Sequence, residues 1–297
     1  MKKYIELSVV VPISRMAGKM ELMFSWISNT LNRDVQIILV HDIQDPRTSD
    51  ELVQFMSRIS QSNVKLIEGI YNSPGLARNA GLELAEGFWV QFIDSDDLPS
   101  IEGSLSLIED ARKESDILVG SFTYWDARHN KKWRLASTGD ARLDLSLNPG
   151  IWRLIFRRER IHTANFSQFR MGEDQLFLLE NRIFNCQLEF SDREIYRYSV
   201  GQSGQLTAQS WALKELELLI PQSIRAYKDS NPNVLKYDSI LVTRQILTLA
   251  KHHLKSHELS IAWLFNLGIR DLPLSRKVQI GKALILILRY RSKYIEC

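Results

Sequence analysis

The sequence predicts an α/β fold, in which a mostly parallel central sheet flanked by helices is followed by a helical C-terminal extension. Three observations predict it. Over the first 126 residues, short runs of β-branched residues alternate with helical patterns, which is the order of a wound α/β sheet. These runs are apolar at nearly every position, as in strands that are buried on both faces. From residue 211 onward, almost the whole chain has helical periodicity instead.

Strands and helices are expected to alternate in the first part of the chain. Five strands are expected, at residues 7–12, 35–40, 64–68, 88–93 and 116–124. Helices are expected at residues 19–31, from a cap at Ser49 or Asp50 to Ile59, between the loop at residues 72–75 and Gly87, and at residues 102–113.

The pattern loosens after residue 124. Residues 131–134 are predicted to lie in a hairpin, and residues 152–160 and 174–184 have helical spacing. The helical tail is broken by the Asn- and Pro-containing segments at residues 231–233 and 271–273. We expect two domains, at residues 1–205 and 206–297.

Composition excludes several classes of protein. The 297 residues are 44% hydrophobic and 25% charged, which excludes disordered and collagen-like proteins. The longest apolar run, at residues 283–288, is far shorter than the roughly 18 residues that cross a bilayer. Two cysteines, Cys186 and Cys297, provide neither a disulfide framework nor a zinc quartet. We expect a cytoplasmic protein.

The net charge of +3 is unevenly distributed. Residues 201–297 hold 14 basic and 7 acidic residues, and the end of the chain from Arg276 holds six basic residues and one acidic residue around the apolar run. This pattern predicts a basic amphipathic helix in peripheral contact with an anionic membrane; the alternative is a packed terminal helix with solvated lysines. No nucleic-acid-reading motif accompanies the basic residues, so nucleic-acid binding is not expected.

Three carboxylates, Asp94, Asp96 and Asp97, directly follow the fourth predicted strand. In open α/β sheets, ligands bind at the carboxyl ends of the strands. Carboxylates that repel one another favour a hard cation such as Mg²⁺ or Mn²⁺. The alternative is a polar turn that caps the following helix.

Two further segments carry candidate chemistry. Arg78 and Asn79 lie one turn into a helix that begins at a Gly-containing loop, where phosphate binding is favoured; the alternative is an ordinary loop–helix junction. Glu173 and Asp174 open another helix, so one acid can face the cleft as a general base while the other is held by the scaffold. The alternative is simple complementarity to the helix dipole.

The order and spacing of these segments resemble those of a family 2 glycosyltransferase with the GT-A fold, a Rossmann-like architecture. The resemblance rests on residues 9–12 (Val-Val-Val-Pro), Asp42, residues 75–81 (Gly-x-x-Arg-Asn-x-Gly), residues 92–97 and residues 172–174 (Gly-Glu-Asp), and it covers roughly residues 5–200. It implies a bacterial enzyme of surface-polysaccharide synthesis, in which residues 1–205 bind a nucleotide-sugar.

The resemblance also implies a donor site. The acid after the second strand contacts the nucleotide base in the family, which corresponds to Asp42, and the backbone near Pro12 lines the same pocket. Arg78 and Asn79 match positions near the nucleotide and its phosphates, and Asp94 matches the acid near the ribose.

The remaining matched residues carry the transfer reaction. Asp96 matches the acid that binds the divalent metal, Mg²⁺ or Mn²⁺, which stabilises the departing nucleoside diphosphate. Asp174 matches the base that deprotonates the acceptor hydroxyl for one displacement with inversion. The expected donor is a UDP-hexose or UDP-N-acetylhexosamine, and the expected acceptor is a glycan or a lipid-linked intermediate.

Two departures from the family pattern leave alternatives open. Residues 41–46 replace the usual stretch rich in Asp, Gly and Ser, and residues 13–15 replace a small polar residue after Pro12. A non-catalytic binding or assembly subunit of a polysaccharide-synthesis complex is therefore one alternative. A nucleotidyltransferase is another, although residues 11–18 lack its glycine-rich loop.

Overall fold

The fold is described from a computed structural model. The structure describes residues 5–59, 63–126, 128–200, 212–256, 267–290 and 294–296. The predicted boundary between residues 205 and 206 lies outside these residues.

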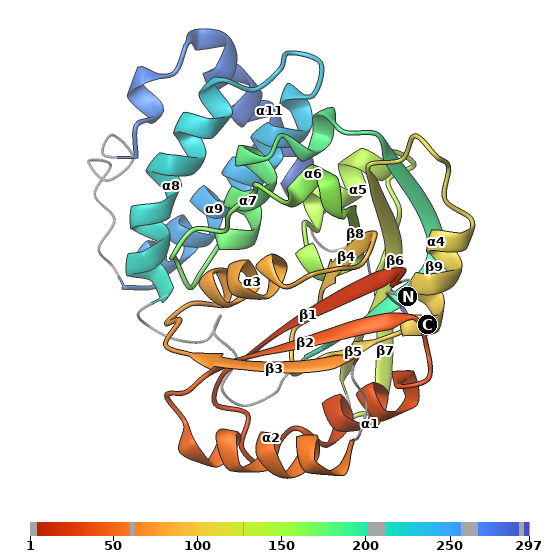
Figure 1. The fold of residues 1–297 in the computed structure, drawn as a ribbon. Coiled ribbons are helices and arrows are strands. Elements are labelled where there is room, and N and C mark those ends of the chain that lie inside the picture. Colours follow the sequence, from red (N-terminus) through yellow and green to blue (C-terminus); the bar gives the residue numbers. More distant parts are fainter. Residues whose placement is uncertain are drawn as a thin grey trace.

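The strands form a single curled sheet (Figure 1). They are β1 (Leu7–Ile13), β2 (Val35–Asp42), β3 (Val64–Gly69), β4 (Trp89–Phe92), β5 (Leu98–Pro99), β6 (Ile117–Asp126), β7 (Lys131–Leu135), β8 (Leu154–Arg157), β9 (Leu188–Ser199) and β10 (Tyr294–Glu296). The sheet order is β10-β7-β6-β8-β4-β1-β2-β3, with β9 paired to β5 and β6. Strands β3, β2, β1 and β4 are parallel neighbours, whereas β8 and β7 run antiparallel to theirs.

Helices cover both faces of the parallel part of the sheet. They are α1 (Glu21–Thr30), α2 (Pro46–Arg58), α3 (Pro74–Glu83), α4 (Ile101–Glu109), α5 (Ala141–Leu147), α6 (Arg158–Ile161), α7 (Glu173–Glu180), α8 (Ala212–Lys228), α9 (Leu235–Ser256) and α11 (Leu274–Tyr290). Val10 and Val40 pack with α3 in one hydrophobic cluster, and Val9 and Leu39 pack with α1 and α2 in another. This alternation follows from the period of two in a strand.

Three sequence expectations were wrong in detail. Residues 154–157 form strand β8 between β4 and β6 rather than continuing a helix, because their backbone groups pair with both neighbouring strands. Helix α2 begins earlier than expected, since the Asp45 side chain accepts from the Arg47 amide and Pro46 occupies the first turn. The helical tail ends in strand β10, which pairs with β7 of the predicted hairpin.

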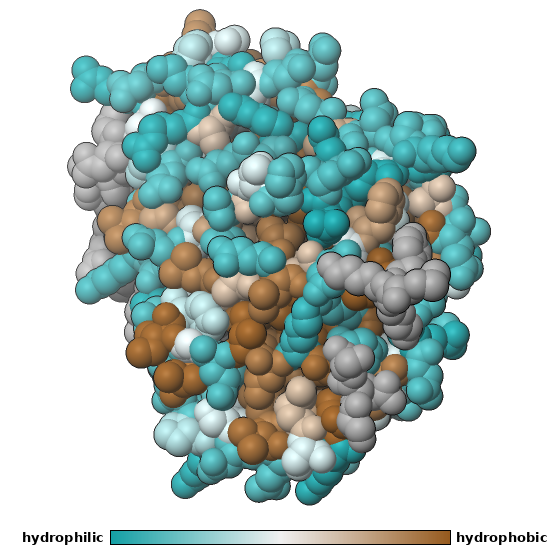
Figure 2. Space-filling view, viewed as in Figure 1, coloured by the Kyte–Doolittle hydropathy of each residue, from teal (hydrophilic) through white to brown (hydrophobic). Residues whose placement is uncertain are grey.

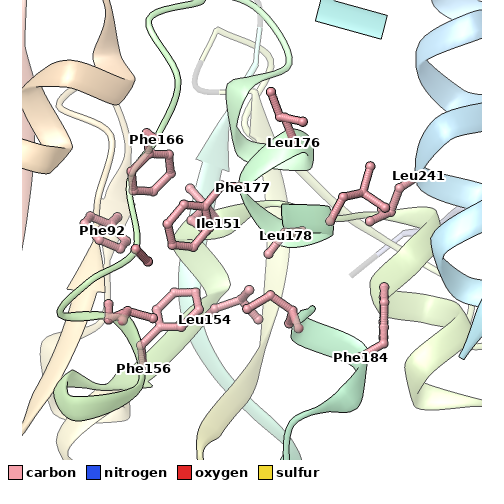
Figure 3. Packing of buried hydrophobic residues seen from close by; sticks show 14 of the residues in the cluster. Phe92, Ile151, Leu154, Phe156, Phe166, Leu176, Phe177, Leu178, Phe184 and Leu241 are labelled. Atoms are coloured by element: carbon pink, nitrogen blue, oxygen red, sulfur yellow. The ribbon is translucent and has the colours of Figure 1, made fainter. Parts of the chain in front are cut away.

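The C-terminal helices share the core of the sheet region. Phe92 of β4, Phe156 of β8 and Phe177 of α7 point toward one another in Figure 3, and Phe166 stacks on Phe177 with 4.0 Å between ring centroids. The same cluster continues to Leu241 of α9 and to residues of α8. The helical region is therefore packed onto the sheet region through α7.

Surface character differs across the face seen in Figure 2. Hydrophobic residues gather over β1, β2 and β3, between α3 and α2, whereas the helical part of this face is mostly hydrophilic (Figures 1 and 2). Among the described residues, no helix combines the length and the apolar character that crossing a membrane requires.

Candidate functional site

The candidate site lies at the carboxyl ends of the parallel strands. Pro12 is the penultimate residue of β1, Asp42 ends β2, and Asp94 follows β4. Because β1 pairs in parallel with both β2 and β4, these ends share one edge of the sheet. Asp42 is buried, and its Oδ2 accepts a hydrogen bond of 2.9 Å from the Asn72 amide, while no described residue donates a hydrogen bond to its buried Oδ1.

Helix α3 brings Arg78 to this edge. Ser73 caps the helix by accepting from the Leu76 amide, and Pro74 starts it. Gly81 lets the helix approach β1 closely, since a Cβ there would lie 2.3 Å from Cγ1 of Val10. The absence of a side chain at Gly81 therefore allows α3 to pack closely against the sheet.

The Arg78 guanidinium bridges two acids. Its Nη2 donates to Oδ1 of Asp94 and its Nη1 to Oε1 of Glu173, each at 2.8 Å, and the side chain is only 4% exposed. Both carboxylates raise the pKa of Arg78 above its usual value, against the opposing effect of burial. Arg78 thus joins the acid after β4 to the helix that carries Asp174.

Asn79 is engaged in a different internal contact. Its amide nitrogen donates to the carbonyl of Phe166 and its amide oxygen accepts from the Phe166 amide, at 2.9 and 2.8 Å. The predicted contacts of Arg78 and Asn79 with nucleotide phosphates remain predictions; in the structure both side chains hold neighbouring segments in place.

The three carboxylates of the acidic turn after β4 lie in different environments. Asp97 is buried, and it accepts from the Tyr196 hydroxyl at 2.7 Å and from the Ser199 amide at 2.6 Å. Burial and then Asp94 raise the pKa of Asp96 to about 6. Asp97 therefore anchors the turn to β9, while Asp94 and Asp96 are more exposed than Asp97.

Asp174 lies at the start of α7, behind Gly172, which adopts a left-handed conformation with φ of 80°. Its Oδ1 accepts from the Gln175 amide at 2.7 Å. Burial is the largest effect on the pKa of Asp174 and Glu173 the second, and together they raise it to about 7, against the opposing effect of Arg78. A carboxylate with a pKa near 7 is suited to accept a proton at neutral pH.

The acids fit a divalent cation that is shared with a ligand. None of the described His, Cys, Asp and Glu side chains gather in a group of three that could hold a metal ion. Mg²⁺ commonly takes one or two carboxylates and fills its remaining positions with phosphate oxygens and water. The raised pKa of Asp96 reflects burial and a neighbouring negative charge, which a cation would compensate.

The structure thus brings together Arg78, Asp94, Asp96 and Asp174, with Pro12 and Asp42 on the same edge of the sheet. Sequence reasoning did not assign a role to Tyr196, which holds Asp97. It expected the scaffold to hold one of the two acids at the start of α7, and Glu173 is the acid paired with Arg78. The only signal for Tyr196 is its place in the Tyr-Arg-Tyr-Ser stretch at residues 196–199. The partners of both residues lie far away in the sequence.

Comparison with known proteins identifies the family. The sequence model of "Glycosyl transferase family 2" matches residues 8–177, more than half of the chain, and this segment contains every predicted site residue. The chain belongs to glycosyl transferase family 2.

Two curated relatives share low identity with the chain. A poly(ribitol-phosphate) beta-glucosyltransferase of Bacillus spizizenii is 25% identical over 214 residues, which are 67% of this chain and 33% of that protein. The minor teichoic acid biosynthesis protein GgaB of Bacillus subtilis is 23% identical over 264 residues, 84% of this chain and 27% of that protein. The chain thus spans about a third or less of the length of these two relatives.

Solved structures confirm the GT-A fold. TarS of S. aureus (residues 1–349, in complex with UDP) matches 94% of this chain and 79% of its own, with a TM-score of 0.58 and 16% identity. The mannosyltransferase PcManGT of Pyrobaculum calidifontis, in complex with GDP-Man and Mn²⁺, matches 96% of this chain and 86% of its own, with a TM-score of 0.61 and 14% identity.

Proposed function

We propose that this family 2 protein is an inverting glycosyltransferase that moves a sugar from a nucleotide diphosphate, UDP in particular, to a hydroxyl of a surface glycan or a lipid-linked intermediate. The observation that carries the proposal is the placement of Asp174 beside the strand ends, with a pKa raised to about 7. The names of the teichoic acid relatives support the acceptor class.

In this proposal the two acids at the start of α7 have separate tasks. Glu173 is buried and paired with Arg78, so its position is fixed. Asp174 accepts the proton of the acceptor hydroxyl, whose oxygen then attacks the anomeric carbon from the face opposite the leaving diphosphate. Arg78 also holds Asp94, so the distance between the proposed base, Asp174, and the edge of the sheet that would bind the donor stays fixed.

The donor would lie along the strand ends. The buried Oδ1 of Asp42, to which no described residue donates a hydrogen bond, is placed to accept an N–H from the nucleotide base, which would satisfy it. Asp94 would contact the ribose, as the resemblance implies, and Asp96 would hold Mg²⁺ or Mn²⁺. The cation supplies positive charge that stabilises the diphosphate as it leaves.

Calorimetric titration tests the donor site. UDP, GDP and dTDP are titrated with and without Mn²⁺ into the intact protein, Asp96→Asn, and Asp110→Asn as an exposed control. We expect one nucleotide to bind with a Kd in the micromolar range, roughly −8 kcal/mol at 1 μM, only with Mn²⁺ and not to Asp96→Asn. If no nucleotide binds to the folded protein, the proposal fails and the non-catalytic alternative is favoured.

A second variant separates binding from transfer. Asp174→Asn keeps the size of the side chain but cannot accept a proton. It should bind the nucleotide as the intact protein does, but it should no longer release nucleotide from the sugar donor. Release by Asp174→Asn at the normal rate would exclude this residue as the base.

We also propose that α11 contacts an anionic membrane surface. Leu274, Val278, Ile285 and Leu288 are 48% to 76% exposed. At about 100° per residue they fall within an arc of about 80°, so they form one apolar stripe. Lys277, Lys282 and Arg289 flank this stripe. An anionic bilayer would bury the apolar side chains of the stripe and attract the flanking cations.

The inner face of α11 is packed against the protein. Ala283 and Ile287 are buried, and Arg276, which the sequence assigned to the lipid, instead donates to the Ser230 carbonyl and stacks over Tyr227. Arg291 and Lys293 lie outside the described residues. Removing the helix would therefore disturb the core, so point variants are the sharper test.

Vesicle co-sedimentation tests the contact. Vesicles of phosphatidylglycerol with phosphatidylcholine are compared with vesicles of phosphatidylcholine alone. Ile285→Gln with Leu288→Gln should lower binding to the anionic vesicles severalfold, while the exposed control pair Val53→Gln with Leu218→Gln should not. Equal binding by the two double variants would exclude the α11 stripe as the membrane contact.

A further inference from the structure

A cavity lies where the sheet meets the C-terminal helices. It has a volume of about 880 Å³ and is lined by β6, the segment from β7 to Arg153, the start of β9, one residue of α9 and two residues of α11. None of the acids at the strand ends lines it, nor do Arg78 and Asn79. Its size is within the range of small-molecule sites.

Three arginines line this cavity: Arg134, Arg153 and Arg244. The acids that line it are Asp144 and Asp192, so cations outnumber anions. Asp144 is engaged locally, because it accepts from the Ser137 hydroxyl at 2.6 Å and from the Thr138 amide at 2.9 Å.

Arg153 is the central cation. Its Nε donates to the Gly120 carbonyl at 3.0 Å, and its guanidinium lies 5.0 Å from the centroid of the Phe122 ring, which fixes its orientation. Within the part of the chain that the structure describes, it forms no ion pair. Burial lowers the pKa of Arg153 to about 10, with Asp144 the main opposing influence, so the group stays charged at neutral pH.

Arg153 is partly buried, and the acid that acts on it, Asp144, already accepts hydrogen bonds from Ser137 and Thr138. An anionic ligand in the cavity would therefore give the guanidinium a favourable partner. The planar guanidinium matches phosphate with two parallel hydrogen bonds. The other lining groups include hydroxyls of Ser121, Ser137 and Thr138 and rings of Tyr124 and Phe190. Such a mixture of hydroxyls and ring faces suits a polyhydroxylated body attached to the anion.

We infer that this cavity is a second ligand site, which binds the phosphate group of a phosphorylated carbohydrate or polyol against Arg153. The site is distinct from the proposed donor site, and its occupation does not require the transfer reaction. Because α5, α9 and α11 close around it, the ligand would contact both the sheet region and the helical tail.

Binding is measured by calorimetry on the full chain, without metal or nucleotide. The probes are glucose 1-phosphate, glycerophosphoglycerol as a phosphodiester, and glucose as the uncharged control. We expect the phosphorylated probes to bind and glucose not to bind. Stronger binding of the monoester supports a free sugar phosphate as the source, and stronger binding of the diester supports a phosphate-linked chain.

Variants locate the binding. Arg153→Met removes the charge but keeps the stem, and it should weaken binding roughly tenfold or more. Exposed Arg134→Ala provides a second variant that leaves the core intact and should weaken binding severalfold. Asp96→Asn should bind as the intact protein does. The inference is overturned if neither phosphorylated probe binds, if folded Arg153→Met and Arg134→Ala both bind normally, or if Asp96→Asn loses binding.

Discussion

Arg78 reaches Glu173 across 95 positions of sequence, with 2.8 Å between its Nη1 and Oε1 of the carboxylate. The pair is buried on both sides, and the same guanidinium also holds Asp94. One cation therefore fixes the relative position of α3, the turn after β4 and the start of α7. Four predictions follow from this arrangement and its neighbours, besides the tests given above.

Arg78→Met is expected to destabilise the protein by about 3–5 kcal/mol, because it leaves two carboxylates without their buried partner. Arg78→Lys should recover only part of this loss, since an ammonium cannot reproduce the two-pronged contact. Urea unfolding measures both changes. Arg128→Met is the control, as its pairing with Asp126 is exposed and should cost less than about 1 kcal/mol. Equal losses at the two arginines would contradict the bridging role.

Transfer activity should depend on the ionisation of Asp174. Its pKa of about 7 predicts that kcat/KM falls about tenfold for each pH unit below 7, because the protonated acid cannot accept the hydroxyl proton. A pH profile of nucleotide release, with nucleotide affinity measured at each pH, checks this. A flat profile between pH 5 and 7 would exclude Asp174 as the base.

Asp174 should also lower the stability of the fold at high pH. Its folded pKa lies above the ordinary value of 3.8, so the folded state binds the proton more tightly than the unfolded state does. Protonated Asp174 therefore favours the folded state fully below pH 3.8, and this stabilisation is lost as the pH rises to about 7 and the carboxyl ionises. At pH 8, Asp174→Asn should be more stable than the intact protein by up to about 4 kcal/mol, and the gain should vanish toward pH 4. Thermal unfolding at both pH values tests this, with exposed Asp50→Asn expected to show no such gain.

Tyr196→Phe removes one of the two donors to buried Asp97. The loss should be about 1–3 kcal/mol, because Oδ2 of Asp97 is left without its hydrogen bond. Tyr198→Phe is the matched control two residues away, and should cost less than about 1 kcal/mol. Urea unfolding compares them, and nucleotide binding by the folded Tyr196→Phe protein should weaken because the turn with Asp96 loses its anchor. Equal unfolding midpoints for the two variants would contradict this role of Tyr196.

The parallel half of the fold and the acids of the candidate site could be predicted from the sequence because their signals are local. Asp94 and Asp96 directly follow a buried strand, and Glu173 and Asp174 open a helix. The separation of the last two, one fixed and one partly exposed, also follows from neighbouring positions on a helix.

The remaining features depend on distant partners. Whether residues 154–157 form a strand or a helix is decided by the open edges of β4 and β6, and a short apolar run is compatible with both. The position of Arg78 in the middle of two acids depends on contacts that span 16 and 95 residues. No local pattern carries such information.

The anchoring of Asp97 has a consequence for the order in which the site is made. Tyr196 and Ser199 follow Asp97 by 99 and 102 positions, so the turn is synthesised long before the groups that hold it. At about 5–20 residues per second, the growing chain carries three neighbouring carboxylates without their anchor for roughly 5–20 seconds. A translation product that stops before β9 would contain Asp94 and Asp96 and still lack the contacts that hold their turn against the sheet.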